Sequence, residues 1–488
     1  MAFLNHWLLT FLLLLPVAGA VVVWIVRPIA AMRWTALGVT LVTLCLSLLI
    51  LVPSKWQRSG AYTEGSAGTV QLLRRSQSGP VHFDVAIDGL SFPFVVMTTL
   101  ICSAACAASL NVSRRPRLYF CLILLFESAT LGLLLGINAM MFYGCLVASL
   151  GPAVLLIGLW GGAGRLQAAA VFLAFMLVSS TCLGIALYGV HRAGGTFDLI
   201  VLANRGMCGA GRGIFLLALV AFLIRLPAVP FHGWLAGVLA EASGPVRAMI
   251  GALVPVTAGY GLLRIVLPLF PHAAMTCWPS LAGLAVITIL FCSFRAWSEK
   301  NLTQSIAYGS ISVTGFALLG FAAMTFAGVN GAIFVLVSQG LILALMMIVI
   351  SRAESGSIYL TFLGIAWFAE IVIPGLVGVL TVLLGVFQVS RPDSVPGQVR
   401  ASTGWVYGIA IASGLGMIFL AAHAAAAIRQ VYSTARTSES GSGESPASDI
   451  GFLAPMAAII ILLGLLPAPL CFTFTRESVE AVLKLMCR

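Results

Sequence analysis

The chain has 488 residues, of which 60% are hydrophobic and 8% are charged, and its formal net charge is +11. Soluble domains carry about a quarter of their residues as charged side chains, so this composition excludes a soluble enzyme. The basic residues are spread over short loops and not gathered on one face, so the charge does not indicate nucleic-acid binding. The composition predicts a multi-pass membrane protein whose first partner is the lipid bilayer.

Apolar runs long enough to cross a bilayer recur from one end of the chain to the other. We expect an all-α polytopic protein of about fourteen transmembrane helices. The first run lacks a basic start and continues to Val26, so we interpret it as a span and not as a signal peptide. The expected spans are 7–26, 34–53, 86–110, 117–136, 139–159, 166–190, 213–231, 246–268, 278–297, 304–322, 327–350, 358–388, 403–431 and 451–472.

The segments between and after these spans carry topological information. More Arg and Lys residues follow the odd-numbered spans, which predicts that both termini lie on the periplasmic side of a bacterial inner membrane, although the basic residues of segment 54–85 oppose this. Segment 54–85 is expected to be an extramembrane loop, and 432–450 a flexible linker rich in Ser, Gly and Glu. In the tail 473–488, apolar residues share one helical face, which predicts a short interfacial helix.

Two apolar runs carry a charge and then a helix break. Arg225 precedes Pro227 and Pro230, and Glu370 precedes Pro374 and Gly375. Proline removes a helical hydrogen bond, and a charge at bilayer depth is tolerated only where it faces a protein interior or a wet cavity. The two broken spans lie five spans apart, which indicates inverted repeats. The predicted regions are 1–116 with three spans, 117–268 as the first five-helix repeat, 278–431 as the second, the linker 432–450, and 451–488 with the last span and the tail.

Few ionisable residues lie within the predicted spans. Arginine does not deprotonate in proteins and is therefore a poor proton carrier. We favour a structural Arg225 that pairs with Glu127 or, as the second choice, Glu241, over direct participation in ion movement. Arg264 and Lys300 lie near helix ends, where long side chains can extend to the interface. The candidates for an ion path or a structural charge are Arg225, Glu127, Glu370, Glu241, His232 and Lys300.

Nothing in the sequence indicates a cofactor bound by this chain. The eleven cysteines contain no C-x-x-C pair and no His/Cys metal spacing. Most of them lie within apolar spans and are interpreted as small buried residues. No phosphate loop, dinucleotide fingerprint or haem motif is found. We therefore expect no metal and no redox centre in this chain.

Several segments, in chain order, are similar to segments of one membrane-protein family. The chain resembles subunit M of respiratory complex I, the bacterial NADH:quinone oxidoreductase, and so the wider antiporter-like family. The resemblance implies a fold of inverted five-helix repeats and proton translocation coupled to electron transport. The segments are FDVAIDGLSFPFVVMTTL at 83–100, GPAVLLIGLWGG at 151–162, FLIRLPAVPFHGWL at 222–235, YGLLRIVLPLFP at 260–271, KNLTQSIAYGSISVTGF at 300–316, VSQGLILALMM at 337–347 and IPGLVGVLTVLLGVFQ at 373–388.

The chain departs from this family at the residues that the family uses for proton transfer. The resemblance places Val147 where the family has the glutamate of its fifth span, and Arg225 where it has the lysine of its seventh. Val256, which follows Pro255, takes the place of the lysine of the eighth span. Gln339 stands at the histidine of the eleventh span. Further departures are Ala236 to Leu239 for Pro-Asp-Ala-His, Thr303 for a lysine, Val313 for a histidine, and Val379 or Val382 for the glutamate of the twelfth span.

Valine cannot carry a proton or hold an ordered water, whose site needs polar partners. The resemblance therefore predicts a degenerate paralogue: a membrane-arm subunit of a complex I-like oxidoreductase that is pumping-deficient or structural. A variant of this hypothesis places a relocated path at Glu127, Glu370 and Gln339. Sister antiporter-like and other membrane-arm subunits are the expected partners, and they would hold the flavin, iron–sulfur clusters and quinone. The alternatives are a subunit of a cation/proton antiporter, of a membrane-bound hydrogenase or of an inorganic-carbon-uptake complex with the same fold.

Overall fold

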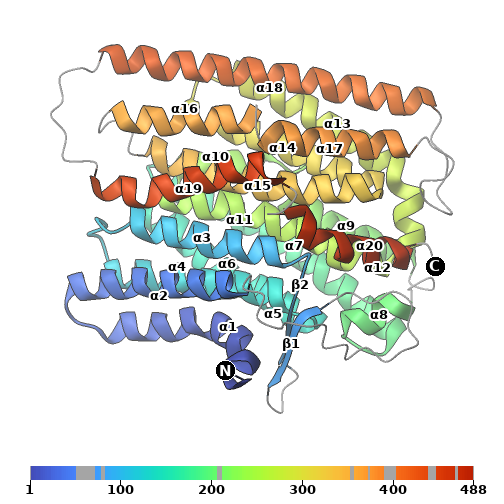
Figure 1. Ribbon diagram of the computed structural model, residues 1–488, viewed down its shortest axis with the longest axis horizontal. Helices are drawn as coiled ribbons and strands as arrows, with labels where there is room; N and C mark the ends of the chain where they lie inside the picture. Colours follow the sequence, from blue (N-terminus) through green and yellow to red (C-terminus); the bar gives the residue numbers. More distant parts are fainter. Residues whose placement is uncertain are drawn as a thin grey trace.

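The computed structural model is a row of long apolar helices that lie side by side, with their axes close to parallel or antiparallel (Figure 1). Helices dominate because backbone groups in lipid must be hydrogen-bonded within their own segment. The structure describes residues 2–50, 72–78, 83–205, 211–351, 357–371, 374–389, 403–437, 447–467 and 471–486.

The elements follow one another in the order of the predicted spans. In the first part of the chain they are α1 (Ala2–Ile25), α2 (Ile29–Leu49), β1 (Leu72–Ser78), β2 (Phe83–Asp88), α3 (Phe92–Ala108), α4 (Pro116–Leu135), α5 (Ala139–Ala148), α6 (Leu150–Trp160), α7 (Arg165–Gly194), α8 (Leu199–Arg205), α9 (Arg212–Arg225) and α10 (Gly233–Glu241). In the second part they are α11 (Gly244–Gly261), the π-helical turn η1 (Leu262–Val266), α12 (Leu267–Leu269), α13 (Pro271–Ser298), α14 (Leu302–Ala323), α15 (Phe326–Ile350), α16 (Ser357–Ile371), α17 (Pro374–Gln388), α18 (Thr403–Thr437), α19 (Ala447–Leu465) and α20 (Thr473–Met486).

The predicted multi-pass, all-α architecture is confirmed. Within the described residues, ten helices are each long and apolar enough to cross a membrane. Three shorter apolar helices, Phe92–Ala108, Gly375–Gln388 and Leu453–Leu465, fall below that length. The expected total of fourteen spans stays a prediction, because breaks divide several of the predicted runs into shorter helices.

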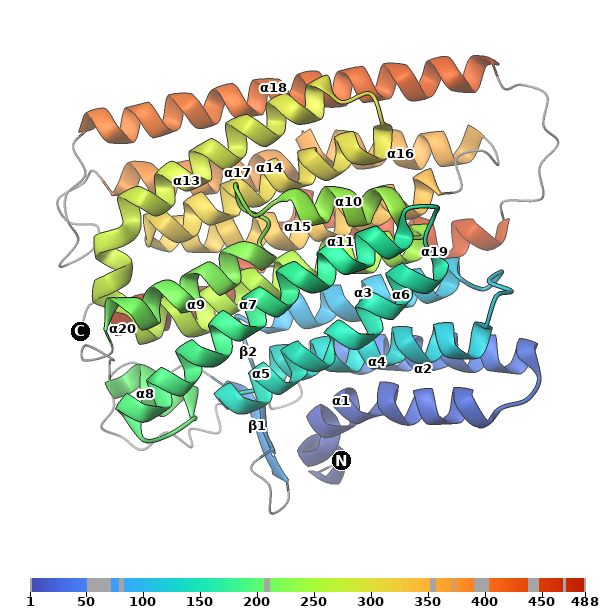
Figure 2. The ribbon, with the colours of Figure 1, turned by 180° about the vertical axis from the view of Figure 1, so that it is seen from behind.

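Three helices form the centre of the bundle. All residues in the apolar stretch of Gly244–Leu269 are buried, and 94% are buried in those of α14 and α15, against 22% in α2. The long helix α18 lies along one side of the row, and α1 and α2 lie along the opposite side (Figures 1 and 2). Polar residues on α11, α14 and α15 therefore face protein and not lipid.

Two segments of the chain are each divided into two helices by a break at proline. Helix α9 ends at Arg225 and α10 begins at Gly233, with Pro227 and Pro230 between them. Helix α16 ends at Ile371 and α17 begins at Pro374. A Cβ atom built on Gly375 would collide with the backbone carbonyl of Glu370, so the chain passes too closely for any side chain at this position.

The structure corrects several predicted boundaries. The predicted span 86–110 begins too early, because residues 83–88 form strand β2, which pairs with β1 in an antiparallel hairpin. Residues 54–71 and 79–82 of the predicted loop and 438–446 of the predicted linker lie outside the described residues, and α18 continues past 431 into that linker. The predicted tail helix exists as α20. It packs on the bundle, where the hydroxyl of Thr475 donates to the amide oxygen of Asn330 at 2.6 Å.

Candidate functional site

Three of the predicted charged residues lie inside the predicted spans, away from the ends of those spans. Glu127 is close to the middle of α4, and Arg225 lies at the break between α9 and α10. Glu370 lies one residue before the end of α16, at the break before α17. Each of these side chains is at least nine-tenths buried. The helix breaks and the buried charges therefore occur together, as in sites built from discontinuous membrane helices.

Arg225 is held by hydroxyl groups. Its Nε donates to the Oγ of Ser179 at 2.9 Å, and its Nη2 donates to the Oγ of Ser180 at 3.0 Å. Ser179 in turn donates to the backbone carbonyl of Ala221 on α9 at 2.8 Å, which links α7 to the helix that carries the arginine. Among the described residues no carboxylate forms a salt bridge with Arg225. The guanidinium is a fixed charge that joins two helices through neutral partners.

The two predicted partners of Arg225 are wrong. Glu127 is fully buried, and neither of its carboxylate oxygens has a hydrogen-bond partner within the described residues. Glu241 instead accepts a hydrogen bond from the backbone N–H of Gly164 at 2.8 Å, just before α7 begins. A carboxylate at a helix N-terminus is stabilised by the free N–H groups and the helix dipole. Glu241 therefore fixes the loop between α6 and α7.

His232 and Lys300 take no part in this buried arrangement. The ring of His232 lies 5.3 Å from that of Phe291 and 6.2 Å from that of Tyr308, measured between centroids. Lys300 is exposed in the short connection between α13 and α14, and its extension to the interface stays a prediction.

Glu370 and Gln339 are buried on neighbouring helices. Gln339 lies on α15 and Glu370 on α16, two helices that pack against each other. Their exposed fractions are 5% for Gln339 and 6% for Glu370. Gln339 also lines a cavity of about 10 Å³ at the junction of α11, α14 and α15, together with Gly251, Pro255, Val256, Ser310 and Thr314. The lining is mainly apolar, and Ser310, Thr314 and Gln339 supply its polar side chains.

Sequence reasoning missed two buried polar contacts. Arg264, which was expected to extend to the interface, is buried and forms a salt bridge with Asp88 at 2.6 Å. His423 on α18 is buried, and its Nδ1 lies 2.9 Å from the Oγ of Ser305 on α14. Asp88 and Arg264 both lie in segments that resemble the family, and this was the sequence signal that could have pointed to them. His423 lies in none of the quoted segments.

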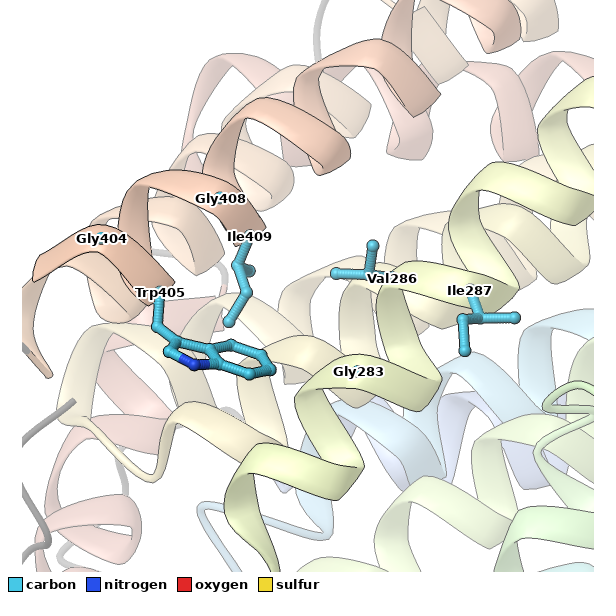
Figure 3. Close-up of a pocket in the computed structure, with 7 residues that line it drawn as sticks. All are labelled: Gly283, Val286, Ile287, Gly404, Trp405, Gly408 and Ile409. Carbon is cyan, nitrogen blue, oxygen red and sulfur yellow. The ribbon is translucent and has the colours of Figure 1, made fainter. Parts of the chain in front are cut away.

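A large apolar groove lies away from these polar residues. A cavity of about 600 Å³ lies between α13 and α18, with Trp405 and Ile409 on one side and Val286 and Ile287 on the other (Figure 3). Its lining is apolar and contains no titratable side chain. No cluster of three His, Cys, Asp or Glu side chains suited to a metal ion occurs in the part of the chain that the structure describes.

Several known proteins are similar to this chain in sequence. A family model described as NADH:quinone oxidoreductase/Mrp antiporter, transmembrane region, matches residues 137–374. The chain is 33% identical to NAD(P)H-quinone oxidoreductase chain 4 2 of Thermosynechococcus vestitus over 69% of its own length and 63% of that protein's. It is 30% identical to chain 4 1 of Picosynechococcus sp. over 93% of its own length and 87% of that protein's. It is 26% identical to NADH-quinone oxidoreductase subunit M of Rhodobacter capsulatus over 94% and 93% of the two lengths.

Solved structures share the fold. A chain of respiratory complex I from Thermus thermophilus with bound NADH superposes with a TM-score of 0.80 at 22% identity, covering 98% of this chain and 100% of that one. A chain of the Mrp complex from Dietzia sp. superposes with a TM-score of 0.77 at 16% identity, covering 99% and 100%. With relatives of 30% identity matched over most of both lengths, this chain belongs to the NADH:quinone oxidoreductase/Mrp antiporter family, as its resemblance to subunit M predicted.

Proposed function

We propose that the chain is a membrane-arm subunit of a complex I-like NADH:quinone oxidoreductase and that it moves few or no protons along the route used by its family. The matched relatives are named as chain 4 or subunit M of quinone oxidoreductases, which supports the assignment to such a complex. The second half of the proposal rests on the chain's own side chains.

The observation that carries this proposal is the set of neighbours around Arg225. A proton route needs groups that release and take up protons, and an arginine does not deprotonate in proteins. The hydroxyls of Ser179 and Ser180 hold the guanidinium, and no described carboxylate pairs with it. Val147, at the position of the family's fifth-span glutamate, follows Tyr143 by one helical turn on α5 and is 40% exposed. In the described residues of the first half, the fixed charge of Arg225 thus has no carboxylate as a partner for proton exchange.

The second half lacks the corresponding lysine. Val256, which takes its place in the resemblance, is 2% exposed and lines the small central cavity with Pro255. A valine there offers neither charge nor a hydrogen bond to a water molecule. The scaffold of the family is therefore retained while two of its charge-bearing positions are apolar.

The proposed partners are sister antiporter-like subunits and other subunits of the membrane arm. In this proposal those partners hold the flavin, the iron–sulfur clusters and the quinone, and this chain binds no redox cofactor. The distribution of basic residues supports a bacterial inner membrane with both termini in the periplasm. The likeness to the Mrp chain at 16% identity concerns the fold alone, and the apolar relay positions count against an antiporter.

Co-purification tests the assignment to a complex. The chain, tagged at its C-terminus, is purified from gently solubilised native membranes, and the accompanying proteins are identified. The proposal expects flavin- and iron–sulfur-bearing subunits together with sister membrane subunits. Recovery of the chain alone, or with small antiporter subunits only, would contradict it. An untagged strain processed in parallel controls for non-specific recovery.

A further inference from the structure

The guanidinium of Arg225 is a buried charge among neutral neighbours. The side chain is 2% exposed, and its hydrogen bonds go to the hydroxyls of Ser179 at 2.9 Å and Ser180 at 3.0 Å on α7. Helices α5, α7 and α9 contain no aspartate and no glutamate. Arginine keeps its charge in proteins, and a buried charge is strongly disfavoured unless it is paired. Arg225 therefore needs a counter-charge that these helices do not supply.

Arg225 keeps hydrogen-bond donors for such a counter-charge. A guanidinium has five N–H donors, and the bonds to Ser179 and Ser180 use two of them. No described residue accepts a hydrogen bond from the other three. Two of these donors belong to Nη1, which is not among the enclosed side-chain atoms without a partner and is therefore still accessible. The guanidinium can thus hold a ligand that accepts from its unused N–H groups.

Two hydroxyl groups near this charge also have hydrogens to donate. Ser180 accepts from Arg225, and its own hydrogen has no acceptor within the described part of the chain. The hydroxyl of Tyr143 on α5 lies against α7 one helical turn after Ser180, 2.8 Å from the place that a Cβ atom on Gly184 would take. Tyr143 likewise has no acceptor among the described side chains and carbonyls. The guanidinium and both hydroxyls are donors, which is the chemistry of an anion-binding site.

Arg264 shows the contrasting arrangement in the same chain. It is also buried, at 7% exposed, but it forms a salt bridge with Asp88 at 2.6 Å. No salt bridge to Arg225 occurs within the described residues. The fold thus provides a carboxylate for one buried arginine and hydroxyl groups for the other.

We propose that Arg225, Ser180 and Tyr143 form a binding site for a small monovalent anion such as chloride, which is the counter-charge of the buried guanidinium. A single negative charge neutralises Arg225, whereas a divalent anion would leave an excess charge inside the membrane. The attraction between the two ions is strong because the surroundings have a low dielectric constant. The inference concerns the chain itself and holds whichever complex contains it.

The dependence of folding on chloride tests this site. The full-length chain is unfolded in lipid–detergent mixtures in which gluconate replaces chloride at constant ionic strength. If unfolding releases one ion, the equilibrium constant for folding rises up to tenfold for each tenfold increase in chloride above its Kd. Wild type is expected to show this dependence, bromide should replace chloride, and Arg225→Met should abolish the effect. Arg476→Met is the control, because this arginine is exposed, and it should keep the wild-type dependence.

A carboxylate built into the site should replace the ion. Ser180→Asp puts a carboxylate next to the Nη2 atom of Arg225, so the folding constant should no longer depend on chloride. Ser180→Asn has nearly the same size without the charge, and it should keep the dependence. At low chloride, Ser180→Asp should therefore be more stable than Ser180→Asn.

Two results would overturn the inference. One is a wild-type chain whose folding does not distinguish chloride from gluconate, as expected if a carboxylate of another subunit were the counter-charge. The other is a chloride dependence that survives Arg225→Met. If Arg225→Met fails to fold, the comparison at Ser180 decides: equal chloride dependence of the Asp and Asn variants rejects the site, and its loss in Ser180→Asp alone supports it.

Discussion

The guanidinium of Arg264 donates to the carboxylate of Asp88 at 2.6 Å, and both side chains are almost completely buried. The contact joins the end of β2 to the π-helical turn η1 that follows α11, across 176 residues of sequence. Asp88 also accepts a hydrogen bond from the backbone N–H of Ser91 at 2.8 Å, which positions the start of α3. One ion pair thus fixes the hairpin, α3 and a central helix relative to one another.

Asp88→Asn should destabilise the folded chain by about 3–5 kcal/mol, because it removes the carboxylate that neutralises the buried charge of Arg264. Asparagine keeps an oxygen that can accept from Ser91, so the change isolates the ion pair. Glu480→Gln is the matched control, since the Arg476–Glu480 pair is exposed and contributes no more than about 0.5 kcal/mol. The free energy of unfolding is measured by denaturant titration in lipid–detergent mixtures. Equal effects of the two substitutions would contradict this account.

Ser180→Ala should cost about 1.5–3 kcal/mol, because a hydrogen bond to a buried charge is lost and a donor of Arg225 is left without a partner. Ser128→Ala, which removes a bond between a neutral hydroxyl and the carbonyl of Leu13, should cost about 0.5–1.5 kcal/mol. Adding Arg225→Met to Ser180→Ala should recover most of the loss, because the orphaned donor disappears. Additive effects in this double-mutant cycle would reject the contact.

Gly375→Ala should prevent stable folding or displace α17, since the new Cβ atom would collide with the carbonyl of Glu370. Gly408→Ala is the control, because a Cβ there meets no atom within 4 Å and lies at the groove between α13 and α18. This control should be neutral or stabilising by up to about 1 kcal/mol, as alanine favours the helix. Thermal unfolding midpoints of the two variants are compared. A Gly375→Ala variant as stable as wild type would contradict the close approach.

The helices could be predicted because membrane-length apolar runs permit few alternatives. The run 166–190 lies within α7, for example, and the prolines after Arg225 coincide with the end of α9. Strand β2 was missed because its residues continue directly into the apolar run of α3. In that run Val85 and Ile87 resemble the start of a helix as much as a buried strand.

The partners within the site could not be predicted in the same way. Arg225 was paired with a glutamate because opposite charges are the usual solution, but adjacent serines on α7 hold it. Glu370 and Gln339 were both named as candidates. Their relative placement depends on how α15 and α16 pack, which periodicity does not specify. Asp88 and Arg264 are too far apart in sequence for spacing to suggest a pair.

The proton-to-electron ratio of the reconstituted complex is the most direct test of the central claim. It is compared between complexes that contain the wild-type chain and complexes that contain Arg225→Met, after assembly to wild-type level has been verified. Because Arg225 acts as a fixed charge beside neutral hydroxyls, we predict the same ratio for both. A lower ratio in the Arg225→Met complex, with electron transfer and assembly intact, would show that protons pass this position and would contradict the account.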